Sequence, residues 1–430
     1  MADSIRPAIR PRHLRFILIS VLSLTSALAR AGNAPPNEEQ APDLKVERPW
    51  IDASMQRGIH TDADTGRKFF TGYSYETLYD WDQYFEGIVQ LHMGWKPDYI
   101  VNGETIFLDN QREDGFIPRS KSRNSSRYPE ESSEMVKPFL AQIAVLVARS
   151  TGRMDWLDEN YYQRMRKYLV YWLVKLSKDG GELSYWRSAP HTGMDTQIER
   201  AGYWRADFCD GVDLNSFLYR ECLAFALVAD TKGHPDDAVF FRRQAERKKE
   251  AILGKMWNEK DGMFYDIDNR TGKQMRVKSI ATFAPMWAEI ATPAQAKRLV
   301  EEHLTNTKEF WRAFPISAYA ATEPGYREQR DPRVDIGCLW RADTWIPTNY
   351  YIFHALHHYG YHVLAGKLAE ITCRKVRQIG VREYYTSDSC RGQGLNPFWG
   401  WSLLAYFMPW EEAQMVDPTD LNLHAPLPTP

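Results

Sequence analysis

The sequence predicts an all-α fold in which helical hairpins form a ring, an (α/α) toroid. Three observations lead to this prediction. Apolar residues recur mostly with the 3.6-residue period of an amphipathic helix. Runs typical of strands are few and short, and short connections alternate with long loops rich in tryptophan. In a ring of hairpins, long loops of this kind gather on one face.

The helical period defines a series of expected helices. Asp213 is the expected N-cap of one of them, and Pro235 lies near the start of the next. Residues 230–234, which join these two helices, form a short connection, so the two helices should make an antiparallel hairpin. The segments expected to be helical are 83–91, 134–148, 161–176, 213–229, 235–257, 293–304, 344–359, 363–379 and 399–407.

Residues 1–31 are predicted to be a secretory signal peptide. Arginines between Arg6 and Arg15 precede an apolar run from Phe16 to Leu28, and Ala27-Leu28-Ala29 fits a small-x-small cleavage site. The alternative is a membrane anchor, but the run is shorter than the roughly 20 residues that cross a bilayer. We therefore expect a periplasmic or secreted protein with no stable membrane insertion after cleavage.

The two ends of the mature chain differ in composition from its middle. Residues 32–46, rich in Ala, Pro, Asn and Glu, are predicted to be a flexible linker, and residues 412–430 a Pro-rich tail. Residues 47–411 contain no second linker rich in Pro, Gly or Ser. They are predicted to form a single compact domain.

Charge and cysteine usage exclude several classes of function. With 54 Lys plus Arg against 56 Asp plus Glu, the net charge of −2 argues against nucleic-acid binding by bulk electrostatics. The 5 cysteines form no C-x-x-C pair and no zinc-like cluster with histidine. His354 and His358 lie four residues apart on an expected helix, but without the H-E-x-x-H pattern we interpret them as helix-face histidines. The sequence carries no signal for an oligomeric state.

Four loop segments place aromatic residues beside carboxylates: 73–85, 191–215, 338–351 and 382–402. The chain contains 15 Trp, 23 Tyr and 19 Phe, a surplus that must serve as helix-packing core or as the wall of a ligand cleft. Aromatic faces stack on the C–H faces of sugar rings, while carboxylates, arginine and amides bind the hydroxyls. The joint occurrence of these groups favours a sugar hydrolase.

Asp195 and Glu383 are the predicted pair of reacting carboxyls. Cleavage of a glycosidic bond needs one protonated carboxyl and one ionised carboxyl, and both residues lie in Gly-flanked, aromatic-rich loops. Only a closed ring would bring them together. Each signal has a plainer alternative: Asp82 and Asp213 could be helix N-caps, isolated tryptophans could be core, and Glu383 could pair with Arg382 on the surface.

The order of the motifs resembles that of glycoside hydrolase family 63. Within it, the chain is most similar to bacterial mannosylglycerate and glucosylglycerate hydrolases, with the trehalases of family 37 as more distant relatives. The resemblance covers about residues 70 to 410. The motifs that carry it are Trp81-Asp82, Gln111 through Arg119, Lys137-Pro138 with Gln142, Gly193-Met194-Asp195, Val212 to Asn215, Trp340-Arg341 with Trp345, and Glu383-Tyr384-Tyr385.

The resemblance implies an (α/α)6 barrel and inverting hydrolysis of an α-glycosidic bond. Asp195 would be the general acid and Glu383 the general base. No metal or other cofactor is implied, because proton transfers carry this chemistry. The residues expected to bind the small glycoside are Tyr79, Trp81, Asp82, Gln142, Trp340, Arg341, Trp345, Tyr385, Trp399 and Trp401.

The chain departs from the family pattern beside the expected sugar. Residues 196–200, Thr-Gln-Ile-Glu-Arg, replace the usual continuation after the acid, while Tyr79 and Phe139 stand where Trp and Pro are usual. The substrate therefore remains a choice between a glucosylglycerate- or mannosylglycerate-like α-glycoside and trehalose, which an exported enzyme could meet. A sugar-binding protein without catalysis is the rival from another class, and the retention of both carboxyls argues against it.

Overall fold

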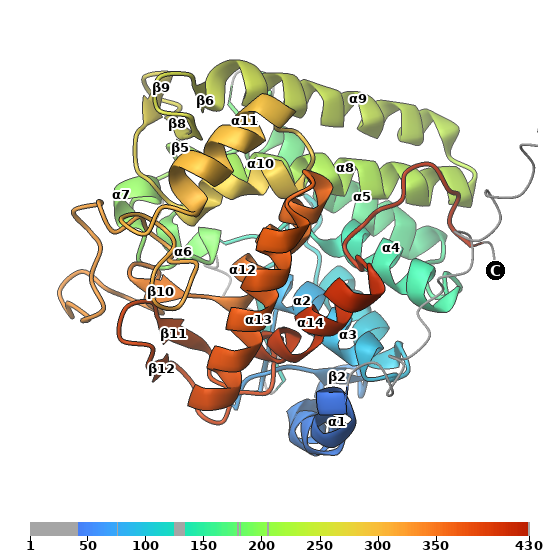
Figure 1. Cartoon of the computed structure of the whole chain (residues 1–430). Helices are drawn as coiled ribbons and strands as arrows, with labels where there is room; N and C mark the ends of the chain where they lie inside the picture. Colours follow the sequence, from blue (N-terminus) through green and yellow to red (C-terminus); the bar gives the residue numbers. More distant parts are fainter. Residues whose placement is uncertain are drawn as a thin grey trace, which may run out of the picture. The chain divides into compact units, whose positions relative to one another are not determined.

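The computed structural model describes residues 42–74, 76–123, 134–178, 180, 182–203 and 206–428. The predicted signal peptide and most of the predicted linker lie outside these residues. Within them the chain is mostly helical, and its strands are two or three residues long (Figure 1). The prediction of a mainly α-helical protein is confirmed for this part of the chain.

The helices vary from single turns to more than five turns. The α-helices are α1 Pro42–Met55, α2 Asp80–His92, α3 Asp98–Asp109, α4 Leu140–Thr151, α5 Glu159–Val174, α6 Ala189–Thr192, α7 Ile198–Ala201, α8 Val212–Lys232, α9 Pro235–Ala251, α10 Ala284–Trp287, α11 Pro293–Arg298, α12 Ile346–His358, α13 His362–Ile379 and α14 Leu404–Gln414. Short 3-10 or π turns lie at Gln56–Gly58, Ile252–Met256, Ile280–Phe283, Leu299–Leu304 and Trp401–Leu403.

The strands form small antiparallel ladders in the loops between helices. Their pairings are β1 Ile59–Thr61 with β2 Lys68–Phe70, β3 Thr77–Tyr79 with β4 Ser120–Ser122, β5 Cys209–Asp210 with β8 Asp266–Asp268 and β8 with β9 Lys273–Met275, β6 Trp257–Asn258 with β7 Met263–Phe264, and β10 Asp343–Thr344 with β11 Tyr384–Thr386 and β11 with β12 Gly392–Gln393. The β10–β11–β12 ladder joins two of the loop segments predicted to carry chemistry.

Each segment predicted to be helical contains a helix, although several boundaries move. The helix expected at 134–148 begins only at Leu140, and the one expected at 399–407 extends to Gln414. Helix α3 was not predicted. Its buried apolar residues come in two consecutive runs separated by Gly103 and the buried Glu104, a pattern without a clear helical period.

The predicted hairpin of α8 and α9 is present. Gly233, with φ of 81°, ends α8 in the left-handed conformation, Pro235 opens α9, and the two helices pack side by side (Figure 1). The N-cap of α8 is Gly211, so the prediction for Asp213 is wrong. The Asp213 carboxylate instead pairs with the buried Arg200.

Helices α2, α4, α8, α10, α12 and α14 pack in a closed cycle. Each contacts the next one, and α14 returns to α2. Helix α9 packs outside α8, and α13 packs outside α12 and α14. A closed inner cycle with helices outside it is consistent with the predicted ring of hairpins.

Aromatic side chains fill the inside of this cycle. Phe139 and Phe217 have ring centroids 5.1 Å apart, and Trp287 and Tyr351 have theirs 5.5 Å apart. These rings are fully or almost fully buried. Part of the aromatic surplus therefore serves as core, and burying such large side chains is a major favourable contribution to folding.

The two predicted solvated ends differ from the prediction. Helix α1 begins at Pro42, within the predicted linker, and Leu44 is buried. The predicted tail packs back on the domain: Trp287 donates from its indole N–H to the Thr419 hydroxyl at 3.0 Å, and Leu421 and Leu427 are buried. Composition alone did not predict this packing, because a few apolar residues and polar groups are enough to anchor a segment on the domain.

Two further properties concern the described residues as a whole. None of their helices combines the length and the apolar character that a membrane crossing requires. The cysteines Cys209, Cys222, Cys338, Cys373 and Cys390 are all free thiols.

Candidate active site

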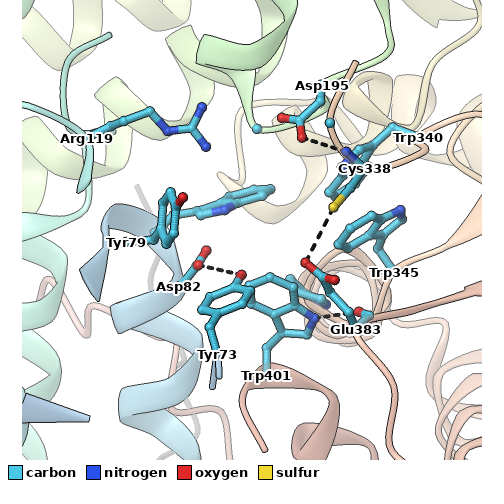
Figure 2. Close-up of a pocket in the computed structure, with 14 residues that line it drawn as sticks. Tyr73, Tyr79, Asp82, Arg119, Asp195, Cys338, Trp340, Trp345, Glu383 and Trp401 are labelled. Carbon is cyan, nitrogen blue, oxygen red and sulfur yellow. Dashed lines mark hydrogen bonds between the residues drawn. The ribbon is translucent and has the colours of Figure 1, made fainter. Parts of the chain in front are cut away.

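The four aromatic, carboxylate-bearing segments meet around one cavity of about 390 Å³ (Figure 2). The ends of inner helices α2 and α12 and the loops beside them supply much of its wall. Its lining residues are Tyr73, Tyr79, Trp81, Asp82, Arg119, Gly193, Asp195, Gly337, Cys338, Trp340, Trp345, Pro347, Glu383 and Trp401. The fold thus brings together segments that lie far apart in the sequence.

Asp195 is presented by a tight turn after helix α6. Ser188 caps this helix by accepting the His191 N–H, and Gly193 follows it with φ of 83°. A Cβ at Gly193 would lie 3.0 Å from Lys137 Cε and 3.1 Å from Trp81. Glycine is therefore needed both for the backbone conformation and for the space.

The Asp195 side chain is half-buried, and its carboxyl has a strong hydrogen bond. Its Oδ2 accepts the backbone N–H of Cys338 at 2.9 Å. Burial raises the pKa of Asp195 to about 6, while Arg119, this N–H and Lys137 oppose the rise. A carboxyl with such a pKa is partly protonated near neutral pH, as a proton donor must be.

Glu383 immediately precedes strand β11, which pairs with β10 and so fixes it beside segment 338–345. Its Oε2 accepts the Leu395 N–H at 2.8 Å, and its Oε1 lies 3.4 Å from the Cys338 thiol, which donates to it. Burial raises the pKa of Glu383, and these two hydrogen bonds hold the rise down. Figure 2 shows Asp195 and Glu383 on either side of Cys338.

Asp82 is a third carboxyl in the cavity wall. It lies in the first turn of α2, whose N-cap is Tyr79, so the N-cap alternative for Asp82 is wrong. Its Oδ2 accepts the Tyr73 hydroxyl at 2.7 Å. Burial, and next the neighbouring Asp80, raise the pKa of Asp82 to about 7. Asp82 can therefore donate or accept a hydrogen bond near neutral pH.

Stacked aromatic rings form the wall beside the carboxyls. Trp340 and Trp345 are parallel within 5° at a centroid distance of 4.0 Å, and Tyr384 continues the stack at 4.5 Å from Trp345. Trp401 lies 5.4 Å from Tyr73, close to Glu383. Apolar ring surfaces next to acidic groups are suited to the two kinds of surface that a sugar presents.

The residues predicted to bind substrate separate into two groups. Tyr79, Trp81, Asp82, Trp340, Trp345 and Trp401 line the cavity. Gln142, Arg341, Tyr385 and Trp399 lie outside its lining, and their polar groups bond to the protein: Gln142 to Arg220 and Pro138, Arg341 to Glu199 and Asp335, Tyr385 to Gly380, and Trp399 to Thr71. Motif membership alone does not tell which side of a loop a residue occupies.

Tyr73, Arg119 and Cys338 line the cavity without having been predicted as site residues. Tyr73 and Cys338 fall inside the aromatic segments, and Arg119 ends one of the family motifs. Their position in these segments was an available signal. The contacts of Cys338 with two carboxyls distant in the sequence were not.

The interpretation of His354 and His358 as helix-face histidines fits their surroundings. His354 lies 3.2 Å from Asp417 and 3.3 Å from Glu411, and His358 lies 2.9 Å from Asp417. These carboxylates come from the last helix and the segment after it. Within the described residues, no group of three or more metal-ligating side chains is arranged to hold an ion.

Comparison with known proteins identifies relatives over most of the chain. A family model described as the mannosylglycerate hydrolase MGH1-like glycoside hydrolase domain matches residues 75–402. The mannosylglycerate hydrolase of Rubrobacter radiotolerans is 27% identical over 195 residues, 44% of this chain and 41% of that protein. A cytosolic neutral trehalase of Neurospora crassa is 28% identical over 209 residues, 43% of this chain and 26% of that protein. The aligned chain thus spans less than half the length of these two relatives.

Solved structures share the fold. The GH63 mannosylglycerate hydrolase from Thermus thermophilus in complex with glucose gives a TM-score of 0.66 at 18% identity, covering 84% of this chain and 99% of that one. The same protein in complex with Tris and D-glycerate gives the same TM-score. A neutral trehalase from Saccharomyces cerevisiae gives 0.61 at 17% identity, covering 89% of this chain and 86% of that one. At these identities the likeness concerns the fold.

Proposed function

Because the chain belongs to the mannosylglycerate hydrolase MGH1-like glycoside hydrolase family, we propose that it is an inverting α-glycosidase acting on a small glycoside. One observation carries the proposal: Asp195 and Glu383 both contact Cys338 at the wall of the same cavity. Two carboxyls at one aromatic-walled cavity are the minimum that glycosidic cleavage requires. The closed cycle of inner helices likewise supports an (α/α)6 toroid as the scaffold.

The two carboxyls would have opposite roles. Asp195, whose pKa burial raises to about 6, would donate its proton to the glycosidic oxygen as the bond to the anomeric carbon breaks. Glu383 would take a proton from the water that attacks this carbon from the opposite face. Room for that water requires the carboxyls to lie roughly 6.5–9.5 Å apart in the substrate complex.

We propose an α-mannoside or α-glucoside of glycerate as the substrate class. Its volume of about 390 Å³ suits a ligand of one or two small units. Arg119 is the basic residue of the described lining, and its Nη1 pairs with Glu134 at 3.0 Å and donates to the Pro190 carbonyl. An arginine beside the acid would neutralise a carboxylate on the leaving group. Complexes of the Thermus relative with glucose and with D-glycerate support this choice.

Trehalose is the second candidate, supported by the trehalases among the relatives of this chain. A hydrolysis screen with purified protein separates the candidates: mannosylglycerate, glucosylglycerate and trehalose are compared, and NMR follows the anomer first released. We expect cleavage of a glycosyl-glycerate with inversion. Faster cleavage of trehalose would select the alternative, retention would overturn the mechanism, and binding without cleavage would indicate a sugar-binding protein.

Arg119 offers a finer test of the acidic leaving group. Arg119→Met should raise KM for a glycosyl-glycerate by roughly tenfold or more, because a charged hydrogen bond is worth about 1.5–3 kcal/mol. The same variant should change KM for a neutral aryl glycoside little. Equal effects on both substrates would contradict a carboxylate contact.

Export remains part of this proposal. The signal pattern of residues 1–31 predicts that the mature protein begins shortly after Ala29. N-terminal sequencing of protein recovered outside the cytoplasm tests this. Recovery of Phe16 to Leu28 in that material would contradict it.

A further inference from the structure

Cys338 connects the two carboxyls proposed to react. Its backbone N–H donates to Asp195 Oδ2 at 2.9 Å, and its thiol donates to Glu383 Oε1 at 3.4 Å (Figure 2). These contacts join positions 143 and 45 residues apart in the sequence. A single residue therefore touches both the proposed acid and the proposed base.

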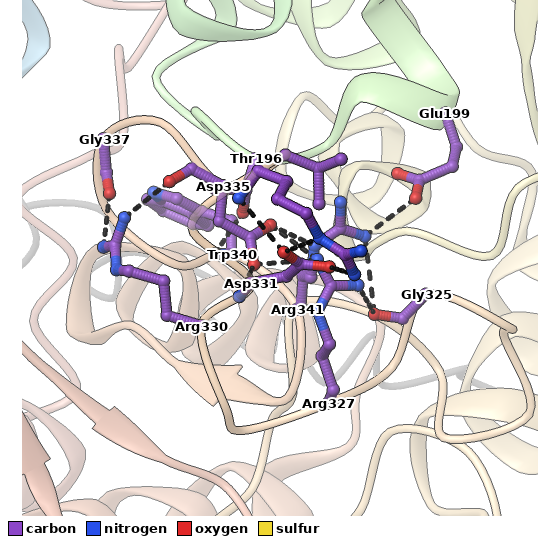
Figure 3. A network of polar contacts seen from close by, with 12 residues as sticks. Thr196, Glu199, Gly325, Arg327, Arg330, Asp331, Asp335, Gly337, Trp340 and Arg341 are labelled. Carbon is purple, nitrogen blue, oxygen red and sulfur yellow. Dashed lines mark hydrogen bonds and ion pairs between the residues drawn. The ribbon is translucent and has the colours of Figure 1, made fainter.

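The loop that carries Cys338 is held by a cluster of charged groups (Figure 3). The buried Asp335 carboxylate accepts from Arg327 Nη2 at 2.6 and 2.8 Å and from Arg341 Nε at 3.0 Å. Arg341 also pairs with Glu199, which follows the proposed acid by about one helical turn. A buried polar network of this kind rigidifies the segments that it joins, so it can hold the start of the loop firmly.

Arg330 fixes the loop on both sides of position 336. Its Nη1 donates to the Asp335 carbonyl at 2.8 Å, and its Nη2 donates to the Gly337 carbonyl at 2.5 Å. The planar guanidinium makes these two bonds with a fixed spacing, which a lysine ammonium does not reproduce. The clamp thereby orients the peptide that supplies the Cys338 N–H.

Gly337 allows the loop to approach Asp195 closely. Its φ is 83°, and a Cβ there would lie 2.4 Å from Asp195 Oδ2. Any side chain at this position would displace the carboxyl or the loop. Residues 330–338 thus combine an arginine clamp, a glycine for close approach and a cysteine with two donors.

We infer that Cys338 is a positioning residue that orients both reacting carboxyls, and that the Arg330 clamp holds it in place. This inference rests on the proposed function for its kinetic consequences. The backbone N–H stabilises the ionised form of Asp195, and the thiol stabilises the ionised form of Glu383. Cys338 thereby influences which carboxyl carries the proton.

Other charged groups act on the same carboxyls and must stay unchanged in a test. Asp195 is also influenced by Arg119, Lys137 and Glu134, and Glu383 by Asp195. None of these residues is altered in the kinetic variants below. Shifts in their pH profiles then report on the loop.

The first experiment separates the thiol from the rest of the residue. Cys338→Ala keeps the backbone N–H but removes the donor to Glu383, so the pKa of Glu383 should rise. The acidic limb of the pH profile of kcat/KM for mannosylglycerate should shift to higher pH by roughly 0.5–1 unit, while the basic limb stays unchanged. Cys338→Ser, which retains a donor, should recover at least part of the shift, and Cys390→Ala, which removes a thiol outside the cavity, should show none. Identical profiles for Cys338→Ala and the parent would overturn the role of the thiol.

The second experiment loosens the loop without touching the cavity. Arg330→Met and Arg330→Lys should weaken the Cys338 N–H bond to Asp195, raise the pKa of Asp195 and move the basic limb upward by up to roughly 1 pH unit. Arg333→Met, at an exposed arginine of the same loop, is the matched control and should leave the profile unchanged. A shift in Arg330→Met that Arg330→Lys fully restores would show that charge, not the clamp, is responsible.

The third experiment needs no catalytic activity. Burial, and next the negative charges of Glu383 and Asp195, raise the pKa of the Cys338 thiol. Glu383→Gln should therefore speed alkylation of Cys338 by iodoacetamide several-fold at fixed pH, because the thiolate is the reacting form. Peptide mass spectrometry measures it, with Cys390 as internal reference. An unchanged ratio of Cys338 alkylation to Cys390 alkylation would overturn the contact. If Cys338 reacts faster in Glu383→Gln but the parent protein hydrolyses no glycoside, only the proposed function is refuted.

Discussion

Two groups of buried and half-buried carboxyls in this molecule have opposite electrostatic character. At the cavity, burial raises the pKa values of Asp195 and Glu383, and few hydrogen bonds oppose it. In the second group, near the C-terminal segment, His354 lies against Glu411 and Asp417. Burial acts to raise the pKa values of these two carboxyls, but His354 and the neighbouring groups lower both.

The contrast teaches that partners, not burial, decide what a buried carboxyl can do. A carboxylate paired with histidine stays ionised and joins two segments of chain. A carboxyl left with one or two neutral donors keeps the raised pKa that burial gives it and can exchange a proton. Substitutions in the two groups should therefore give different kinds of defect: loss of turnover in the first and loss of stability in the second.

The largest effect should come from Glu383→Ala. Without the proposed base no group activates the water, so turnover of every glycoside should fall by roughly 10²–10⁴-fold or more, with little change in melting temperature. Added azide, a small nucleophile that needs no deprotonation, should restore part of the turnover. Activity near that of the parent protein would remove Glu383 from the mechanism.

Asp195→Ala should show a loss that depends on the leaving group. A natural glycoside needs a proton on its departing oxygen, so its hydrolysis should fall by roughly 10²–10⁴-fold. A glycosyl fluoride needs little proton assistance and should still be cleaved at a measurable rate. The ratio of the two rates is the measurement. Near-parental hydrolysis of the natural substrate would make Asp195 a binding residue and direct the search for the acid to Asp82, the third carboxyl of the cavity wall.

The second group should respond through stability. Burial acts to lower the pKa of His354, but Asp417 and Glu411 raise it. Glu411→Ala leaves buried partners uncompensated, which costs about 3–5 kcal/mol. Thermal unfolding should show this loss, and substrate KM for the remaining folded protein should change little. A normal melting temperature would contradict the contrast between the two groups.

The pH dependence of stability follows from the same pairs. The pKa of His354 is higher in the folded protein than in the unfolded chain. Its contribution to stability is therefore fully present below its unfolded-state pKa and is lost as pH rises through its folded-state pKa. The pKa of Asp417 is lower in the folded protein than in the unfolded chain. Its contribution to stability is therefore fully present above its unfolded-state pKa and is lost as pH falls through its folded-state pKa. Replacing His354 with Gln should flatten the alkaline side of a plot of melting temperature against pH.

The sequence predicted the helical class and the residues whose chemistry is specific. Asp195, Glu383 and Trp81 could be found because carboxylates and aromatics recur together in ordered motifs. The anchoring of Thr419 on Trp287 could not, because it depends on the packing of segments 132 residues apart. The same holds for Cys338, whose role depends on two long-range hydrogen bonds. Local patterns specify helices and reactive groups, whereas partners are fixed only by the closed fold.

Trp399 provides the smallest expected effect and separates motif membership from contact with substrate. The sequence placed it in the sugar site, yet its indole N–H donates to the Thr71 carbonyl at 2.7 Å and it lies outside the cavity lining. Trp399→Phe removes this hydrogen bond and should cost about 0.5–1.5 kcal/mol of folding stability.

Trp345→Phe is the matched control, because Trp345 lines the cavity in the stack with Trp340. Only the control should raise KM, since only it changes the surface that faces a sugar. Chemical denaturation and steady-state kinetics on both variants measure the two effects, and a raised KM in Trp399→Phe with unchanged stability would return Trp399 to the binding site.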